Sequence, residues 1–168
     1  MTLDELFIIL TTYIQSLEEP QTVKTKFIEN IPKLTDWENR VEFNDTYTRI
    51  RINKNEIGEL ILICWNSGQK TIIHDHSDSN CWMGVLSGSI SEIIYEIPDE
   101  HFESYTGQLN EVQVNNHSKG SVGFISMGIH EILALKDKTV TLHLYSPPLE
   151  KVKIYGKQKN LITCKYLI

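Results

Sequence analysis

The N-terminal part of the chain has the hydrophobic periodicity of helices. Apolar side chains recur there every three or four residues, as on one face of an amphipathic helix. These positions are Leu3, Leu6, Phe7, Leu10, Tyr13, Ile14 and Leu17. Thr2 and Glu5 fit a capping box at the start of this helix, and Pro20 ends the pattern. A second, shorter helix is expected over residues 22–30, whereas residues 33–42 have no clear pattern.

Beyond this region the pattern changes to that of β-strands. Tyr47, Arg49 and Arg51 alternate with apolar side chains, so two isoleucines between them are expected to pack under the helices. Residues 59–65 are expected to form a continuous apolar strand that is covered on both faces. Further strands are expected at 70–75, 80–87, 89–97, 110–115, 121–126, 131–136, 139–145, 151–155 and 161–166. Many short strands separated by Gly and Asn turns predict a closed barrel or a two-sheet sandwich.

Length and composition limit the classes of protein that fit. The 168 residues suffice for one domain with a core, and 40% hydrophobic and 23% charged residues are ordinary values. A net charge of −6 without a basic stripe argues against a nucleic-acid or anionic-membrane partner. No apolar run reaches the roughly 18 residues of a membrane span. Asp4 and Glu5 stand where a signal peptide would carry basic residues.

The three cysteines do not have the spacing of a disulfide framework. They are Cys64, Cys81 and Cys164, an odd number at irregular intervals. A reducing cytoplasm is therefore the expected compartment. A monomer is the default expectation for the assembly.

The strongest chemical signal is a pair of histidines, His74 and His76, which lie two residues apart. On a strand both would point to the same face and supply half of a metal site. Gly68 and Gly88 flank the pair, and this stretch resembles the first cupin signature, Gly-x5-His-x-His-x4-Glu-x6-Gly. Cys81 stands at the position of the glutamate.

A third histidine, His130, follows the glycine-rich segment KGSVGFISMGI, which resembles the second cupin motif with Ser126 in place of the usual proline. Three neutral imidazoles without a carboxylate leave the full 2+ charge on a bound metal. That charge favours an anionic thiolate and lowers the pKa of a bound thiol. Zinc and nickel also bind three histidines, so these residues alone leave the metal open.

Several further motifs resemble the thiol dioxygenases, and specifically the cysteine dioxygenases, over about residues 45–150. They are YTR (47–49), LICWNSG (62–68), IHDHSDSNC (73–81), LSGSISE (86–92), GIHEI (128–132) and HLYSPP (143–148). The resemblance implies a mainly β, jelly-roll-like cupin barrel with short N-terminal helices. The expected domain is residues 1–168, with a helical cap over 1–42 and the barrel over 43–168.

The same resemblance implies a function. An enzyme of this family uses Fe(II) and O2 to convert the free thiol L-cysteine to its sulfinic acid. Two alternatives stay open: a dioxygenase for another small thiol such as 3-mercaptopropionate, and a non-catalytic metal-binding cupin that acts as a sensor. Relatives that prefer 3-mercaptopropionate tend to have Gln at the position of Arg49, so Arg49 favours cysteine.

The resemblance also implies the role of individual residues. The iron ligands are His74, His76 and His130. Arg49 matches the arginine that binds the substrate carboxylate, with Arg51 as a rival, and Tyr47 matches a tyrosine that lines the pocket. Cys81 and Tyr145 match a pair that forms a thioether cross-link.

His143 matches the histidine that forms a hydrogen bond to that tyrosine, which makes Tyr145, His143 and Cys81 the expected catalytic residues. Ser146–Pro147 matches a cis peptide bond of the family. The residue pattern agrees independently, because Thr139, Thr141, His143 and Tyr145 share one face of a strand. Such a face suits a polar cavity better than an apolar core.

Other residues have simpler interpretations. We expect Cys64 in the core, Cys164 in the tail, and packing roles for Trp37, Trp65 and Trp82. Solvated loops are expected around His101 and His117 and in the acidic run 99–103. Asp75 and Asp78 either orient the histidines or are turn residues, and the sequence does not decide between the two.

Overall fold

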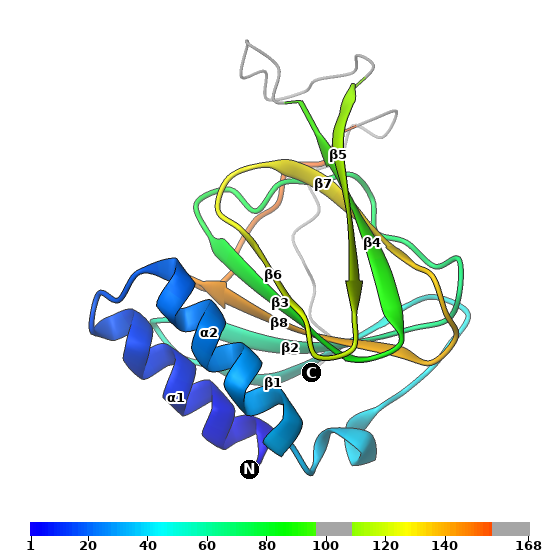
Figure 1. Ribbon diagram of the computed structural model, residues 1–168. Helices are drawn as coiled ribbons and strands as arrows, with labels where there is room; N and C mark the ends of the chain where they lie inside the picture. The colour runs from blue at the N-terminus through cyan, green and yellow to red at the C-terminus, as the bar shows by residue number, and fades with distance from the viewer. Residues whose placement is uncertain (97–108, 156–168) are drawn as a thin grey trace.

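The computed structural model describes residues 1–96 and 109–155, and it begins with two helices (Figure 1). Helix α1 spans Leu3–Gln15 and helix α2 spans Pro20–Asn30, and short 3-10 turns follow at Ile31–Lys33 and Trp37–Arg40. The predicted capping box is confirmed, because the Thr2 hydroxyl accepts from the Glu5 N–H and the Glu5 carboxylate accepts from the Thr2 N–H. Helix α2 begins two residues earlier than predicted, at a proline. A proline suits that position because the first N–H of a helix has no intrahelical partner.

The strands form two antiparallel sheets. The larger sheet has the order β1-β2-β8-β3-β6, with β1 Thr48–Lys54, β2 Glu59–Trp65, β8 Thr139–Ser146, β3 Asn80–Ser87 and β6 Val122–Ile125. The smaller sheet has the order β5-β4-β7, with β5 Glu111–Ser118, β4 Ser89–Tyr95 and β7 Ile129–Ala134. The mainly β architecture with N-terminal helices is confirmed. The two sheets remain separate, so the two-sheet arrangement holds rather than a closed barrel.

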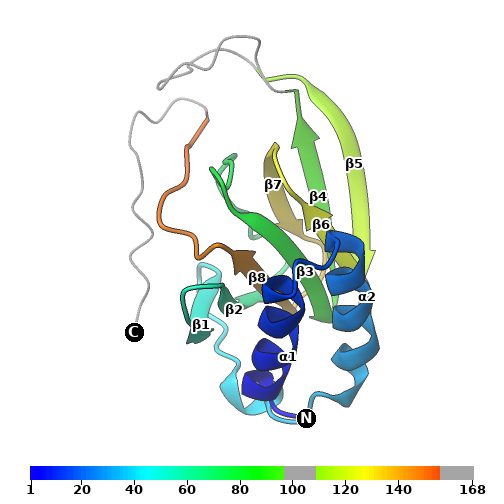
Figure 2. The same ribbon diagram turned by 90° about the vertical axis from the view of Figure 1, so that its left-hand side faces the viewer.

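The molecule has three layers, with the helices on the outer face of the larger sheet and the smaller sheet opposite its inner face (Figures 1 and 2). Strand β8 lies at the centre of the larger sheet. Its side chains Val140, Leu142 and Leu144 pack in the core under the helices, and Ile50 and Ile52 contact the same core, as expected. A second core fills the space between the two sheets.

The chain crosses from the larger sheet to the smaller at Gly88, between β3 and β4. Its φ of +74° lies in the left-handed region that glycine tolerates best. A Cβ added there would overlap the Thr139 hydroxyl and lie 2.8 Å from the Thr139 Cα. This sharp, crowded connection brings β4 to the face opposite β8.

Two segments that were predicted as strands do not form regular strands. Residues 70–75 form only isolated bridges, in which Lys70 pairs with Leu133 and His74 pairs with His130, and residues 151–155 contribute one bridge, Ile154 with His74. The ladder is interrupted because the Thr71 hydroxyl accepts the Ile132 N–H at 3.0 Å in place of a backbone carbonyl. Predictions for the strand 161–166, His101, the acidic run 99–103 and Cys164 lie outside the described residues.

A cis peptide bond and the length of the helices can also be compared with the sequence predictions. The Ser146–Pro147 peptide bond is cis, as the family resemblance implied. Among the described residues, neither helix is long and apolar enough to cross a bilayer.

Candidate metal centre

The structure brings the three predicted histidines together between the two sheets. His74 and His130 are bound to each other through both backbone N–H groups, at 2.9 Å each, and His76 follows two residues later. Their ligand nitrogens all lie within 4.8 Å of one another, and the two Nε2 atoms of His76 and His130 are 3.1 Å apart. Metal–nitrogen bonds of about 2.1 Å separate adjacent ligands by roughly 3 Å, so His76 and His130 already have the spacing of two adjacent ligands.

Hydrogen bonds orient two of these imidazoles. His74 Nδ1 donates to the Ile72 carbonyl at 2.7 Å, and His130 Nδ1 donates to Glu92 Oε1 at 2.9 Å. A carbonyl and an ionised carboxylate only accept, so each Nδ1 carries the proton and each Nε2 keeps its lone pair for a metal. Burial, followed by the neighbouring His130, lowers the pKa of His74 to about 3 and that of His76 well below its usual value. Both rings are therefore neutral ligands at pH 7.

Glu92 is a site residue that sequence reasoning missed. Its carboxylate is buried and accepts from His130 through one oxygen and from His117 Nε2 through the other, at 3.2 Å. Burial alone would raise its pKa, but the hydrogen bonds from His117 and His130 lower the pKa of Glu92 to about 2. The sequence did contain a signal for this residue. Glu92 lies between Ile90 and Ile94 on the same face of β4, so a charged side chain interrupts an apolar face.

The prediction of a solvated loop around His117 is therefore wrong. It lies on strand β5, and only 14% of its side chain is exposed. Its sequence context, NNHSKG, is polar because the other side chains of this edge strand are mostly exposed. One inward position on a polar strand leaves almost no periodicity for sequence analysis to detect.

The opposite wall of the site is the inner face of strand β8, and it has the composition that the sequence predicted. Thr141, His143 and Tyr145 are all buried on this face. Trp65 Nε1 donates to the Thr141 hydroxyl at 2.9 Å, and that hydroxyl lies 2.9 Å from His143 Nε2. His143 Nδ1 lies 3.4 Å from the Tyr145 hydroxyl. The Tyr145 ring meets the His76 ring edge-on at 5.2 Å, so this chain of polar groups ends beside the histidine cluster.

Cys81 faces the same space from the neighbouring strand. It is the direct register partner of Tyr145 in the β3–β8 pairing, and its Sγ lies 4.0 Å from His143 Nδ1. Burial raises the pKa of the Cys81 thiol, so the thiol is protonated at neutral pH. Cys64, by contrast, lies in the core under the helices, as predicted.

The two arginines of strand β1 have different surroundings. Arg51 Nε donates to Glu59 Oε1 at 2.7 Å, and this glutamate is completely buried. Arg49 lines a small cavity of about 70 Å³ together with His74 and Tyr47. The Tyr47 ring stacks on Trp65 with centroids 4.7 Å apart, and its role in substrate binding stays a prediction.

Charge from Arg49 reaches the imidazoles. After burial, its positive charge is the next cause that lowers the pKa of His143, and it also contributes at His74 and His76. Arg49, rather than Arg51, is therefore the arginine that lies near the histidine cluster.

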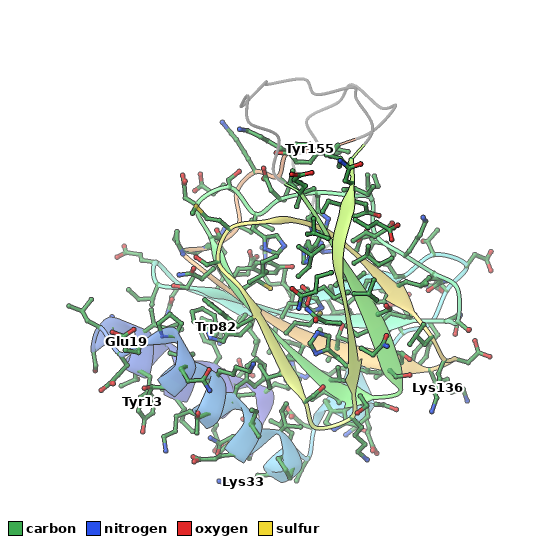
Figure 3. All side chains as sticks on the ribbon, turned by 45° about the horizontal axis from the view of Figure 1, so that its top comes forward. Tyr13, Glu19, Lys33, Trp82, Lys136 and Tyr155 are labelled. Carbon is green, nitrogen blue, oxygen red and sulfur yellow. The ribbon has the colours of Figure 1, made fainter. Side chains whose placement is uncertain are left out.

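Asp75 acts as a turn and docking residue rather than as a partner of the histidines. Its carboxylate accepts from the Ser77 N–H, the Lys153 N–H and the Tyr155 hydroxyl, and so it holds the 151–155 segment beside the site. Tyr155 is labelled in Figure 3, at the end of the molecule away from the helices. Asp78 lines a second, larger hollow of about 880 Å³ that also includes His76.

The tryptophans pack as predicted. Trp65 is fully buried between the sheets, and Trp37 contacts the core under the helices. Trp82, labelled in Figure 3, lies beside α2 and donates from Nε1 to the Pro20 carbonyl at 3.0 Å.

Two facing antiparallel sheets with three converging imidazoles define a metal-binding cupin. Solved structures agree on the fold. An uncharacterised double-stranded β-helix protein from Klebsiella pneumoniae is 12% identical, with a TM-score of 0.54, 73% of this chain and 90% of that chain covered. A cupin from Desulfovibrio desulfuricans is 19% identical, with a TM-score of 0.50, 64% of this chain and 90% of that chain covered.

The family is more specific than the fold. The chain belongs to the cysteine dioxygenase type I family, whose model matches residues 4–158. It is 28% identical to cysteine dioxygenase type 1 of Danio rerio over 165 residues, which cover 94% of this chain and 80% of the relative. It is also 28% identical to the human protein of the same name, with 90% of this chain and 76% of the relative covered. The protein is therefore a member of an oxygenase family with a three-histidine site.

Proposed function

We propose that this protein is a non-haem Fe(II) thiol dioxygenase that converts L-cysteine and O2 to cysteine sulfinic acid. The observation that carries the proposal is the cavity in which Arg49 and His74 face the same small space. Membership of the cysteine dioxygenase type I family supports the same chemistry.

The donor set fits Fe(II) in this role. His74, His76 and His130 would hold it through neutral nitrogens. The Glu92 carboxylate is not a ligand in this arrangement, because its oxygens bind His117 and the Nδ1 of His130. When bound, Fe(II) supplies the redox chemistry that joins O2 to a thiolate sulfur, and its uncompensated 2+ charge favours the thiolate.

Arg49 would set the class of substrate. A planar guanidinium binds a carboxylate through two parallel hydrogen bonds, and a buried site strengthens such a pair. Arg51 is already bound to the Glu59 carboxylate, so Arg49 supplies the positive charge of the cavity. A volume of about 70 Å³ holds only a few water-sized spheres, which favours a small substrate beside Arg49 and His74.

The reaction needs no reductant from outside. The sulfur of a thiol gives four electrons when it becomes a sulfinic acid, and one O2 accepts all four while both of its atoms are incorporated. Tyr145, held by His143 and Thr141, would donate a hydrogen bond to the reacting oxygen or to the substrate carboxylate. The fixed geometry of these groups is what the protein contributes.

A Cys81–Tyr145 thioether is part of the proposal. The two residues are directly opposite on adjacent strands, where Cβ atoms lie roughly 5 Å apart. Joining Sγ to a ring carbon of Tyr145 removes two hydrogens and two electrons, which O2 accepts. Mass spectrometry of the Fe(II)-treated, air-exposed protein should show a loss of about two mass units that Cys81→Ser abolishes.

The deciding experiment is O2 uptake by the Fe(II)-loaded protein with L-cysteine, D-cysteine, 3-mercaptopropionate and cysteamine, with products identified by mass. Uptake selective for L-cysteine, with formation of its sulfinate, is the expected result. Preference for 3-mercaptopropionate would retain the chemistry and replace the substrate. Bound iron without uptake for any thiol would refute the dioxygenase and favour a sensor.

A further inference from the structure

We infer that His117 is a positioning residue that holds Glu92, and through it the imidazole of His130, in the orientation of a metal ligand. The inference rests on the proposed metal site and concerns residues beyond its three ligands. It assigns a role in metal binding to an edge strand that contributes no ligand of its own.

The three side chains form a row across the smaller sheet. His117 on β5 is the register partner of Ile90 on β4, and Glu92 lies two residues further along the same face. On the other side, Glu92 is the register partner of Ile132 on β7, and His130 lies two residues away. Both neighbours of Glu92 are thus diagonal, which is a reach that long side chains manage across a sheet.

Both oxygens of the carboxylate are used. Oε2 accepts from His117 Nε2 at 3.2 Å, and Oε1 accepts from His130 Nδ1 at 2.9 Å. The last torsion of a glutamate side chain has broad minima, so rotamer preference alone does not fix the plane of this carboxylate. Two donors at opposite oxygens fix it, and the fixed plane then sets the tilt of the His130 ring.

The fold keeps a space for the His117 ring. A Cβ added to Gly123 on β6 would lie 3.0 Å from His117 Cε1 and 3.2 Å from Nε2, closer than side chains normally approach. The ring therefore lies against the backbone of the larger sheet while it binds a carboxylate of the smaller sheet. Side-chain exposures of 14% for His117 and 5% for Glu92 agree with this position between the sheets.

The loss of the outer donor should be felt at the metal. Partners that bind directly to a ligand change metal affinity by about 10- to 100-fold when mutated. His117 is one step further out, so we expect His117→Leu to weaken binding by about 3- to 10-fold, below that range. His117→Gln retains an N–H donor of similar reach and should recover affinity to within about twofold. Gly123→Ala, which displaces the ring without removing it, should weaken binding in the same direction.

The test is a titration of the metal-free protein with Co(II), followed by its visible absorption, with urea unfolding of each metal-free variant measured in parallel. The control is Asn116→Ala, an exposed neighbour on β5 that should leave both measurements unchanged. Weaker binding in His117→Leu and in Gly123→Ala, with recovery in His117→Gln, supports the role. Wild-type affinity for His117→Leu, or no recovery with His117→Gln, overturns it.

The proposed function has a separate control in the same titration. If His130→Ala binds Co(II) as tightly as the wild type, the three-histidine site itself is wrong. If His130→Ala abolishes binding and His117→Leu has no effect, the metal site stands and only the role of His117 is refuted.

Discussion

The two sheets meet at the same site but contribute to it differently. The smaller sheet supplies His130 and the row of groups behind it, Glu92 and His117, which end in a metal ligand. The larger sheet supplies Arg49, which lines the cavity beside His74, and Tyr145, whose ring meets that of His76 and whose hydroxyl lies 3.4 Å from His143 Nδ1. Under the proposed function, one side holds the metal, and the other holds and orients the substrate.

This division has a consequence for mutations. Changes in the smaller sheet should act first on metal affinity. Changes in the larger sheet should act on substrate binding or on stability with the metal retained, except at Gly123, where an added Cβ would displace the His117 ring of the smaller sheet. A larger-sheet variant of the substrate side that lost metal affinity, or a smaller-sheet variant that lost only substrate binding, would contradict this division.

The largest effect is expected for His130→Ala. It removes one of three nitrogen ligands and leaves Glu92 with a buried carboxylate that has lost one donor. Metal affinity should fall by more than about 100-fold, beyond the range seen when only an outer partner is changed. The check is to treat the variant with Fe(II), separate it by gel filtration and measure the iron bound per protein. Stoichiometric iron in the variant would contradict the assignment.

Acid should destabilise the metal-free protein by several kcal/mol. Burial lowers the pKa of His74 to about 3 and those of His76 and His143 well below normal, so the unfolded chain binds protons that the folded chain does not. Above the ordinary pKa of about 6.5 the imidazoles are neutral in both states and no difference arises. Between about pH 6.5 and 3 the free energy of unfolding should fall by at most about 1.4 kcal/mol per pH unit for each imidazole.

Urea unfolding of the metal-free protein at pH 7, 6 and 5 checks this window. His143→Gln removes one of the three imidazoles and should reduce the slope by about one proton. A flat profile from pH 7 to 5 would mean that the rings are protonated or exposed in the folded state.

Site residues could be predicted from the sequence where they lie close together along the chain. His74 and His76 are two residues apart, and Thr141, His143 and Tyr145 alternate on one strand, so their shared faces follow from the period of a strand. The helices and most strands were predicted for the same reason. Strand 70–75 was predicted too regular, because the competition of the Thr71 side chain for the Ile132 N–H has no periodic signal.

The row from His117 to His130 was missed for a different reason. Its members lie 25 and 38 residues from Glu92 along the chain, and only the register of β5, β4 and β7 makes them neighbours. The sequence favoured Arg49 over Arg51 only through the family resemblance, and the structure adds that Arg49 lines the cavity beside His74. Both lie on the same face of β1, and Arg51 binds the buried Glu59.

Arg49→Gln should reduce kcat/KM for L-cysteine by about 10- to 100-fold, since a hydrogen bond to a charged group contributes about 1.5–3 kcal/mol. The carboxylate does not react, so most of the loss should appear as a higher KM. Cysteamine has no carboxylate, and its kcat/KM should change little. Arg51→Lys, which keeps a cation beside Glu59, is the matched control, and an equal loss in both variants would contradict the assignment.

The smallest and most selective effect is expected for Thr141→Val, which replaces a hydroxyl by a methyl group of the same size. The change removes the acceptor of the Trp65 Nε1 hydrogen bond and the partner of His143 Nε2, both at 2.9 Å. A buried donor left unsatisfied costs about 1–3 kcal/mol, so the free energy of unfolding should fall by that amount in urea.

Thr141→Ser keeps the hydroxyl and loses only a methyl group, at a cost of about 0.8 kcal/mol, and should retain both hydrogen bonds. Because this chain of groups belongs to the larger sheet, Co(II) affinity should stay within about twofold in both variants. Loss of metal affinity in Thr141→Val would show that Trp65, Thr141 and His143 also support the metal ligands, and the division of labour between the sheets would then be wrong.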